Sequence, residues 1–143
     1  MSPLDRMLAE HEITRLVIRY AMLNDDGDYP AVAALYVEDG CMARPSGGEP
    51  IVGREAILRS FLARPLRIAR HVITSILPEI VSDTEATCRS TMVLHAAPAG
   101  DLPARAKGAA LLGGFRDRLT LTPDGWRFAE RIGTVDMTIG EQQ

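Results

Sequence analysis

The helix predicted over residues 4–26 is the feature that most constrains how this chain folds, because it carries a single buried stripe. Its apolar residues recur at the i, i+3, i+4, i+7, i+8 spacing of one helix face: Ile13, Leu16, Val17, Tyr20 and Ala21. Asn24 continues this stripe and Asp25 lies at its edge, so an amide and a carboxylate face whatever the helix packs on. Burial of these groups without partners would cost roughly 1–3 kcal/mol or more. We therefore expect either a sheet that satisfies them or a cavity that holds a polar ligand or water.

The rest of the chain is predicted to form two shorter helices and then long strands. Residues 28–36 show a short helical pattern that a turn at Glu38-Asp39-Gly40 ends, and another helix opens at Gly53 and ends at Pro65. Short strands are expected at residues 41–44 and 50–52, and long ones at residues 68–81, 86–96, 108–122 and 126–137. This order predicts an α+β fold, with a curved, mixed, mostly antiparallel sheet wrapped around the first helix.

Strand periodicity indicates which side chains face the helix. One face of the strand at residues 86–96 carries Cys88, Ser90, Met92 and Leu94, and the other carries Arg89, Thr91, Val93 and His95. A curved sheet over a long helix makes a cone, whose open end is a natural small-molecule pocket. We expect this pocket to be lined by Leu16, Tyr20, Asn24, Tyr36, Ile57, Phe61, Met92 and Leu112.

Composition excludes several classes of function. The chain has 143 residues, which suits a single domain over residues 1–143, and a net charge of −3, which argues against a nucleic-acid partner. No apolar run approaches the roughly 20 residues that span a bilayer, so we expect a cytoplasmic protein without a membrane partner. Cys41 and Cys88 are expected to be free thiols. We predict no metal and no cofactor, because no metal-ligand spacing and no phosphate-binding glycine motif is present.

Of the three histidines, His71 is the best candidate for chemistry. It begins a long strand and shares a face with Ile73, Ser75 and Leu77, so it points toward the interior. An inward histidine is more often a satisfied core residue than a catalyst, and this reading stays open. The alternative is a pair with Asp25, in which the carboxylate fixes the imidazole tautomer and the imidazole moves a proton.

Several stretches resemble the SnoaL-like branch of the NTF2-like superfamily. They span nearly the whole chain: Tyr20-Ala21, Asp25 to Asp28, Ala34 to Gly40, Gly53 to Ile57, Arg70-His71, and Asp124 to Phe128 with Arg131. The resemblance implies a cone-shaped α+β barrel that is commonly dimeric through its sheet. It implies members that are dehydratases, isomerases, cyclases or epoxide hydrolases, and others that are not enzymes. Fold alone does not decide among these functions.

Within this family the chain is most similar to scytalone dehydratase. The tyrosine and aspartate of that enzyme fall on Asn24 and Asp25, its first strand histidine on His71, and its second near His95. Its second pocket tyrosine falls on Arg44, so the water-binding tyrosines are not kept.

Ketosteroid isomerase is similar through Tyr20 and Asp117, but its general base would fall on Arg44, which disfavours that isomerisation.

We therefore predict cofactor-independent acid/base chemistry, as a dehydration, isomerisation or cyclisation, on a small hydroxylated cyclic or polyketide-like compound. His71 would carry the proton, Asp25 would orient it, and Tyr20 and Asn24 would bind the substrate oxygen. The other expected substrate-binding residues are Tyr36, Arg44, Phe61, Met92, His95, Leu112 and Asp117. The alternative is a non-catalytic binding or assembly subunit that resembles the β subunit of ring-hydroxylating dioxygenases. A homodimer or higher homo-oligomer through the sheet is expected in either case.

Overall fold

The N-terminal helix forms along the predicted stripe in the computed structural model, which describes residues 1–140. Helix α1 spans Pro3–Asp26, and its first turn is fixed by a reciprocal capping box between Ser2 and Asp5. Gly27 ends it in the left-handed conformation, with φ of 76°. The position of the C-terminal end of α1 matters because it directs the last turn of this helix toward the sheet.

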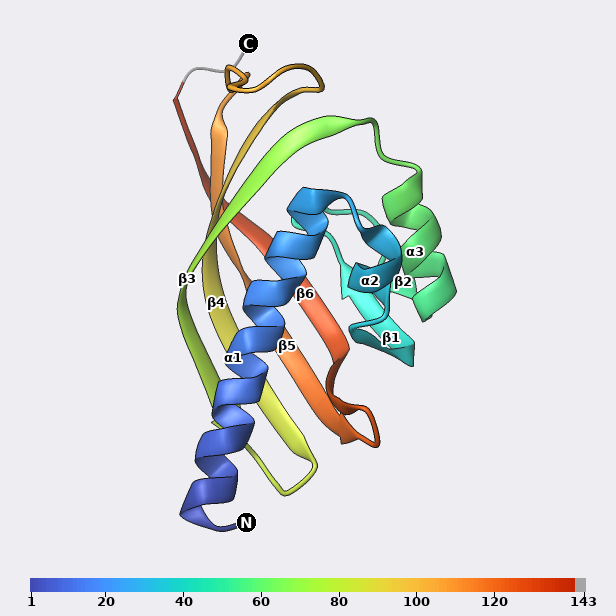
Figure 1. Ribbon diagram of the computed structural model, residues 1–143, viewed down its shortest axis with the longest axis vertical. Helices are drawn as coiled ribbons and strands as arrows, with labels where there is room; N and C mark the ends of the chain where they lie inside the picture. The colour runs from blue at the N-terminus through green and yellow to red at the C-terminus, as the bar shows by residue number, and fades with distance from the viewer. Residues whose placement is uncertain (141–143) are drawn as a thin grey trace.

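Two short helices and six strands follow α1 (Figure 1). Their bounds are α2 Tyr29–Ala33, β1 Tyr36–Ala43, β2 Ile51–Val52, α3 Arg54–Leu62, β3 Arg67–Ile80, β4 Glu85–Pro98, β5 Ala110–Thr122 and β6 Gly125–Ile139. The strand order is β2-β1-β6-β5-β4-β3, and every neighbouring pair is antiparallel except β1 and β6. The predicted α+β fold with a mixed, mostly antiparallel sheet is confirmed.

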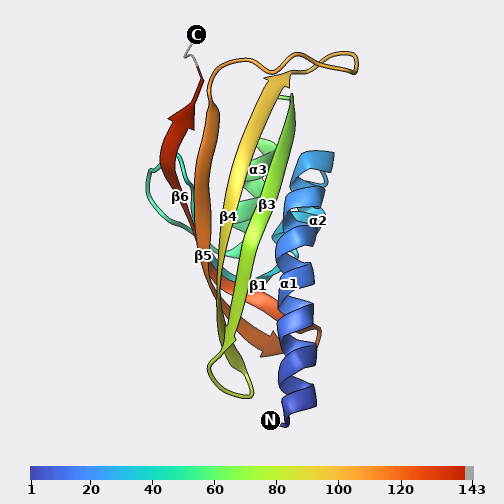
Figure 2. The same ribbon diagram turned by 90° about the vertical axis from the view of Figure 1, so that its left-hand side faces the viewer.

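All three helices lie on one side of the curved sheet (Figures 1 and 2). Helix α1 packs mainly against β3, whereas α2 and α3 pack at the end formed by β1 and β2. Within residues 1–140 no helix lies over the opposite face, which Figure 2 shows uncovered. The same part of the chain has no helix that is long and apolar enough to cross a membrane.

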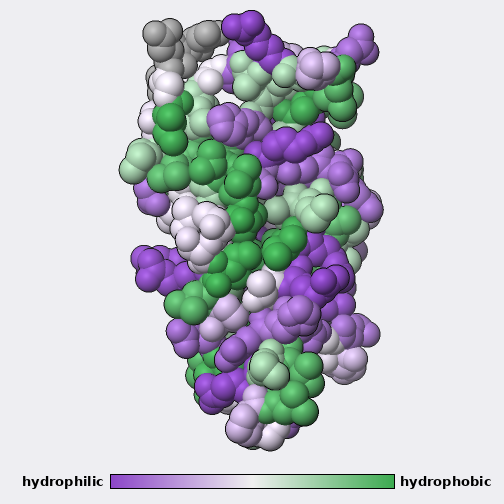
Figure 3. All heavy atoms as spheres, turned by 60° about the vertical axis from the view of Figure 1, so that its left-hand side comes forward, coloured by the Kyte–Doolittle hydropathy of each residue, from purple (hydrophilic) through white to green (hydrophobic). Residues whose placement is uncertain are grey.

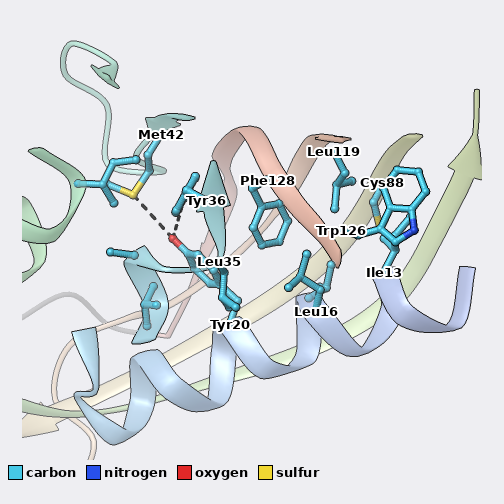
Figure 4. Packing of buried hydrophobic residues seen from close by; sticks show 14 of the residues in the cluster. Ile13, Leu16, Tyr20, Leu35, Tyr36, Met42, Cys88, Leu119, Trp126 and Phe128 are labelled. Carbon is cyan, nitrogen blue, oxygen red and sulfur yellow. Dashed lines mark hydrogen bonds between the residues drawn. The ribbon is translucent and has the colours of Figure 1, made fainter. Parts of the chain in front are cut away.

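The hydrophobic core joins the stripe of α1 to the inner face of β5 and β6 (Figure 4). Ile13 and Tyr20 face Leu119, Trp126 and Phe128, and all five side chains are buried. Burial of each large side chain here contributes roughly 1.5–3 kcal/mol. This packing fixes α1, and therefore its polar last turn, relative to the sheet.

Three predictions of local structure are wrong, and two of them fall where the strand register shifts. The expected helix at residues 28–36 ends at Ala33, and the expected turn at Glu38–Gly40 lies inside β1, whose register shifts between Tyr36 and Cys41. In β3 the register shifts between Thr74 and Leu77. Strict alternation therefore fails after Ile73, and Ser75 and Leu77 do not share the face of His71: both are exposed.

Candidate active site

The last turn of α1 meets the start of β3 through a pair of contacts between Asp25 and His71. Asp25 Oδ2 accepts a hydrogen bond from the His71 backbone N–H at 2.8 Å, and Oδ1 lies 2.5 Å from His71 Nδ1. A carboxylate only accepts hydrogen bonds, so Nδ1 carries the shared proton. The other ring nitrogen, Nε2, has no hydrogen bond to any of residues 1–140.

A cavity of about 370 Å³ opens beside this pair, and His71 forms part of its wall. Its apolar lining includes Met42, Phe61, Met92, Leu94, Leu111 and Phe115. Its polar lining includes Tyr20, Asn24, Arg44, Arg64, Arg67, His71 and Arg131. An apolar chamber with a few convergent polar groups is typical of a site for a small organic molecule.

Arg131 is the most buried charged residue, with only 1% of its surface exposed. Its Nε donates a hydrogen bond to Asp117 Oδ1 at 3.0 Å, and its guanidinium lies 3.8 Å from the ring centre of Phe115 and 4.3 Å from that of Tyr20. Burial raises the pKa of the Asp117 carboxyl, although the charge of Arg131 opposes the rise. The ion pair with Asp117 and the contacts with the two aromatic rings together hold the guanidinium in one position.

The two buried tyrosines are linked by their hydroxyl groups. Tyr20 and Tyr36 hydroxyl oxygens lie 2.9 Å apart, and the Tyr20 hydroxyl also lies 3.7 Å from Met42 Sδ (Figure 4). Burial raises the pKa of both phenols, so both stay neutral at physiological pH. Tyr20 borders the cavity, whereas Tyr36 stands behind it and supports Tyr20.

The structure places six of the thirteen predicted site residues on the cavity wall. The residues that line it are Tyr20, Asn24, Arg44, Phe61, His71 and Met92. Asp25 and Asp117 stand one layer behind, each bonded to a lining residue. Leu16, Tyr36 and Ile57 are buried in the adjacent core and are not part of the wall.

His95 and Leu112 lie away from the cavity, contrary to expectation. Strand alternation turns Met92 and Leu94 inward and His95 outward, where it is exposed. Likewise Leu111 lines the cavity, and Leu112 pairs with Val93 on the outer face. The correction for both residues is that they belong to the uncovered face of the sheet.

Arg131 is a residue of the cavity wall that the sequence pattern did not predict. Trp126 and Phe128 point inward, so strict alternation puts Glu130 on the inner face. The β5–β6 register shifts between Arg118 and Leu119, however, and this bulge turns Arg131 inward instead. A bulge leaves no reliable signal in the sequence. The alternating aromatic residues Trp126 and Phe128, which precede Arg131, are the one available clue.

Several buried polar atoms have no hydrogen-bond partner among residues 1–140. They are Arg44 Nε, Ser90 Oγ, Asp117 Oδ2 and Arg131 Nη2. In the same part of the chain no group of three His, Cys, Asp or Glu side chains is arranged to hold a metal ion.

Comparisons with known proteins show the family and the fold. A family model described as the SnoaL-like domain matches residues 5–132. The chain belongs to the SnoaL-like family. This family includes cofactor-free isomerases and dehydratases, and its members bind small apolar ligands. No individually curated protein matches the sequence.

Solved structures show the same fold. A provisionally named scytalone dehydratase from Novosphingobium aromaticivorans is similar with a TM-score of 0.83 at 22% identity, over 99% of this chain and 93% of the other. An NTF2-like protein from the same organism has a TM-score of 0.76 at 25% identity, over 93% and 85%. A provisionally named aromatic ring hydroxylase, also from N. aromaticivorans, has a TM-score of 0.77 at 22% identity, over 96% and 93%. The SnoaL-like, NTF2-like architecture is thus shared among proteins with different provisional names.

Proposed function

We propose that this SnoaL-like protein is a cofactor-independent acid/base enzyme that dehydrates, isomerises or cyclises a small hydroxylated cyclic or polyketide-like compound. The observation that carries the proposal is the Asp25–His71 pair at the wall of an apolar cavity. The side chains of His71 and Asp25 are 8% and 11% exposed, so their hydrogen bond is largely shielded from water. Shielding strengthens the bond that orients the ring.

The geometry supports distinct roles for the two residues. Asp25 fixes the ring with Nδ1 protonated, so Nε2 of this cavity-lining residue would act as the proton acceptor. In a dehydration, Nε2 would take a proton from the carbon beside a carbonyl and deliver it to the leaving hydroxyl, which departs as water. Asn24 and Tyr20 border the same space and would bind the substrate oxygen.

Proton transfer itself provides the test, because it can be detected before the natural substrate is known. A panel of hydroxylated cyclic ketones is incubated with the protein in D₂O, and deuterium uptake beside the carbonyl is followed by NMR. We expect His71→Gln to slow uptake about 10²- to 10⁴-fold, the usual contribution of a general base. His11→Gln, on the exposed surface of α1, is the matched control and should leave the rate unchanged.

Two outcomes would favour other functions. Uptake that persists in His71→Gln would make His71 a core residue held by Asp25. A protein that exchanges nothing, and that co-purifies with a larger metal-bearing subunit, would be the assembly subunit that some members of this fold class form.

We further propose that the protein pairs with a second copy through the uncovered face of the sheet. A row of apolar residues crosses four strands there in register: Val72, Val93, Leu112 and Met137. Val72 is 56% exposed and Met137 54%. Hydrophobic residues gather in a band over this face in Figure 3. A continuous apolar patch on a soluble protein is typical of an interaction surface.

A further inference from the structure

The cavity carries an excess of positive charge that the proposed proton transfer does not use. Arg44, Arg64, Arg67 and Arg131 all line it. Among residues 1–140, only Arg131 of these four forms a salt bridge. The remaining acid beside the cavity, Asp25, is bonded to His71. Burial and the nearby guanidinium groups of Arg44 and Arg67 lower the pKa of Arg64.

Two of these arginines also present buried N–H groups that lack an acceptor. Arg131 Nη2 and Arg44 Nε have no hydrogen-bond partner within the described chain. Each guanidinium is nonetheless fixed by its other atoms: Arg131 Nε by Asp117, and Arg44 Nη2 by the Ser60 carbonyl at 2.8 Å. A buried N–H donor of a charged group costs free energy when it has no acceptor. Because both guanidinium groups are already held in place, their unpaired N–H groups are preorganised to bind an acceptor.

The two N–H groups without an acceptor belong to residues on the same side of the cavity. Arg131 is paired with Met42 in the parallel β1–β6 ladder, and Arg44 comes directly after Ala43, the last residue of β1, so both arginines line the cavity at this end of the sheet. His71 lies on β3, separated from β6 by β5 and β4 in the sheet order. Apolar side chains of Met92, Leu111 and Phe115 lie between the two sides.

We propose that the side of the cavity formed by Arg44 and Arg131 is an anion subsite, which binds the carboxylate of a small apolar acid and directs the rest of that molecule toward His71. Charge-assisted hydrogen bonds from two guanidinium groups to one carboxylate are short and strong. This inference rests on the proposed function for what happens at His71, but the binding of the acid does not depend on turnover.

The test is the affinity of two probes of nearly the same size and shape, the anion 2-naphthoate and the neutral 2-naphthamide, measured by isothermal titration calorimetry. We expect the wild-type protein to bind the acid at least about tenfold more tightly than the amide, with a preference that weakens as salt is raised. Arg44→Gln should remove most of that preference. Arg6→Gln, at the exposed far end of α1, makes the same change in net charge and should leave the preference intact.

Arg131 needs a compensated variant, because its removal alone leaves Asp117 buried without its partner. The double variant Arg131→Gln/Asp117→Asn replaces the pair with neutral amides, and its folding is checked by circular dichroism before titration. It should bind the acid and the amide about equally. Equal affinities in the wild type, no binding of either probe at millimolar concentration, or a preference that survives in both variants would overturn the proposal.

His71→Gln separates this inference from the proposed function. It should keep the preference for naphthoate while losing deuterium exchange. If exchange persists and the preference also persists, acid/base catalysis by His71 fails and the anion subsite stands.

Discussion

Asp25 holds His71 by two atoms at once, because one carboxylate oxygen accepts the backbone N–H and the other contacts ring atom Nδ1. The residue that orients the ring therefore also joins the C-terminal end of α1 to β3. Substitutions at this position are expected to affect the tautomer of His71 and the stability of this junction separately.

Asp25→Asn tests the tautomer directly. The amide oxygen can still accept the His71 backbone N–H, but the amide nitrogen then faces Nδ1 and must donate to it. The ring is forced into the Nε2-protonated form, so Nε2 can no longer accept a proton. We expect ¹⁵N NMR to show this switch and kcat to fall with little change in KM, while the free energy of unfolding drops by only about 1 kcal/mol. Unchanged ¹⁵N shifts would contradict this role.

Asp117→Asn should be the more destabilising of the two aspartate substitutions. It removes the carboxylate that compensates a buried guanidinium, and breaking such a pair costs roughly 3–5 kcal/mol. Urea denaturation measures the change, and the double variant with Arg131→Gln should recover part of the loss. A single variant within about 1 kcal/mol of the wild type would mean that the aromatic rings alone stabilise Arg131.

The two cysteines should differ in reactivity. Burial raises the pKa of the Cys88 thiol to about 12, whereas Cys41 is only half-buried, although its pKa is also raised. The thiolate is the reactive form and is almost absent at Cys88 near neutral pH. Treatment of the folded protein with a disulfide reagent at pH 8, followed by mass spectrometry, should modify Cys41 alone, and both should react in denaturant. Rapid labelling of Cys88 under native conditions would show that β4 opens readily.

Gly113→Ala should distort the sheet. A Cβ at this position would lie 1.8 Å from the Thr134 carbonyl oxygen, a backbone atom that cannot move aside cheaply. We expect a loss of about 3 kcal/mol, at the upper end of ordinary overpacking. Gly100→Ala is the matched control, since no atom lies within 4 Å of its Cβ position, and it should change stability by less than about 0.5 kcal/mol. Similar melting temperatures for both variants would contradict the close approach of β5 and β6.

The proposed dimer depends on the apolar row of the uncovered face. Val72→Glu places a charge in that row and should yield a monomer by light scattering, whereas the wild type should have twice the 15.6 kDa mass of one chain. Val81→Glu, at an exposed position just beyond β3 and outside the row, should stay dimeric. A monomeric wild type would remove the basis for the interface.

The sequence predicts the parts of this protein that follow regular periodicity. The stripe of α1 placed Asn24 and Asp25 at the sheet, and alternation before the bulge of β3 placed His71 inward.

Periodicity fails where a strand gains a residue or where both of its faces are apolar. The bulge in β6 exchanges the expected Glu130 for Arg131 on the inner face. Leu112 is apolar and lies on the outer face, because it belongs to the row that crosses the sheet. Sequence pattern alone cannot separate an apolar residue that packs in the core from one that lies on the outer face of the sheet.

The parallel pairing of β1 with β6 has a consequence for how the protein is made. Every strand between them in sequence must be synthesised before this ladder can close, and contacts between such distant segments form slowly. A nascent chain stalled after β4 already contains both partners of the Asp25–His71 contact, yet it lacks Arg131. On the ribosome, the side of the cavity that carries His71 can form early. The cavity becomes complete only when β6 has been synthesised.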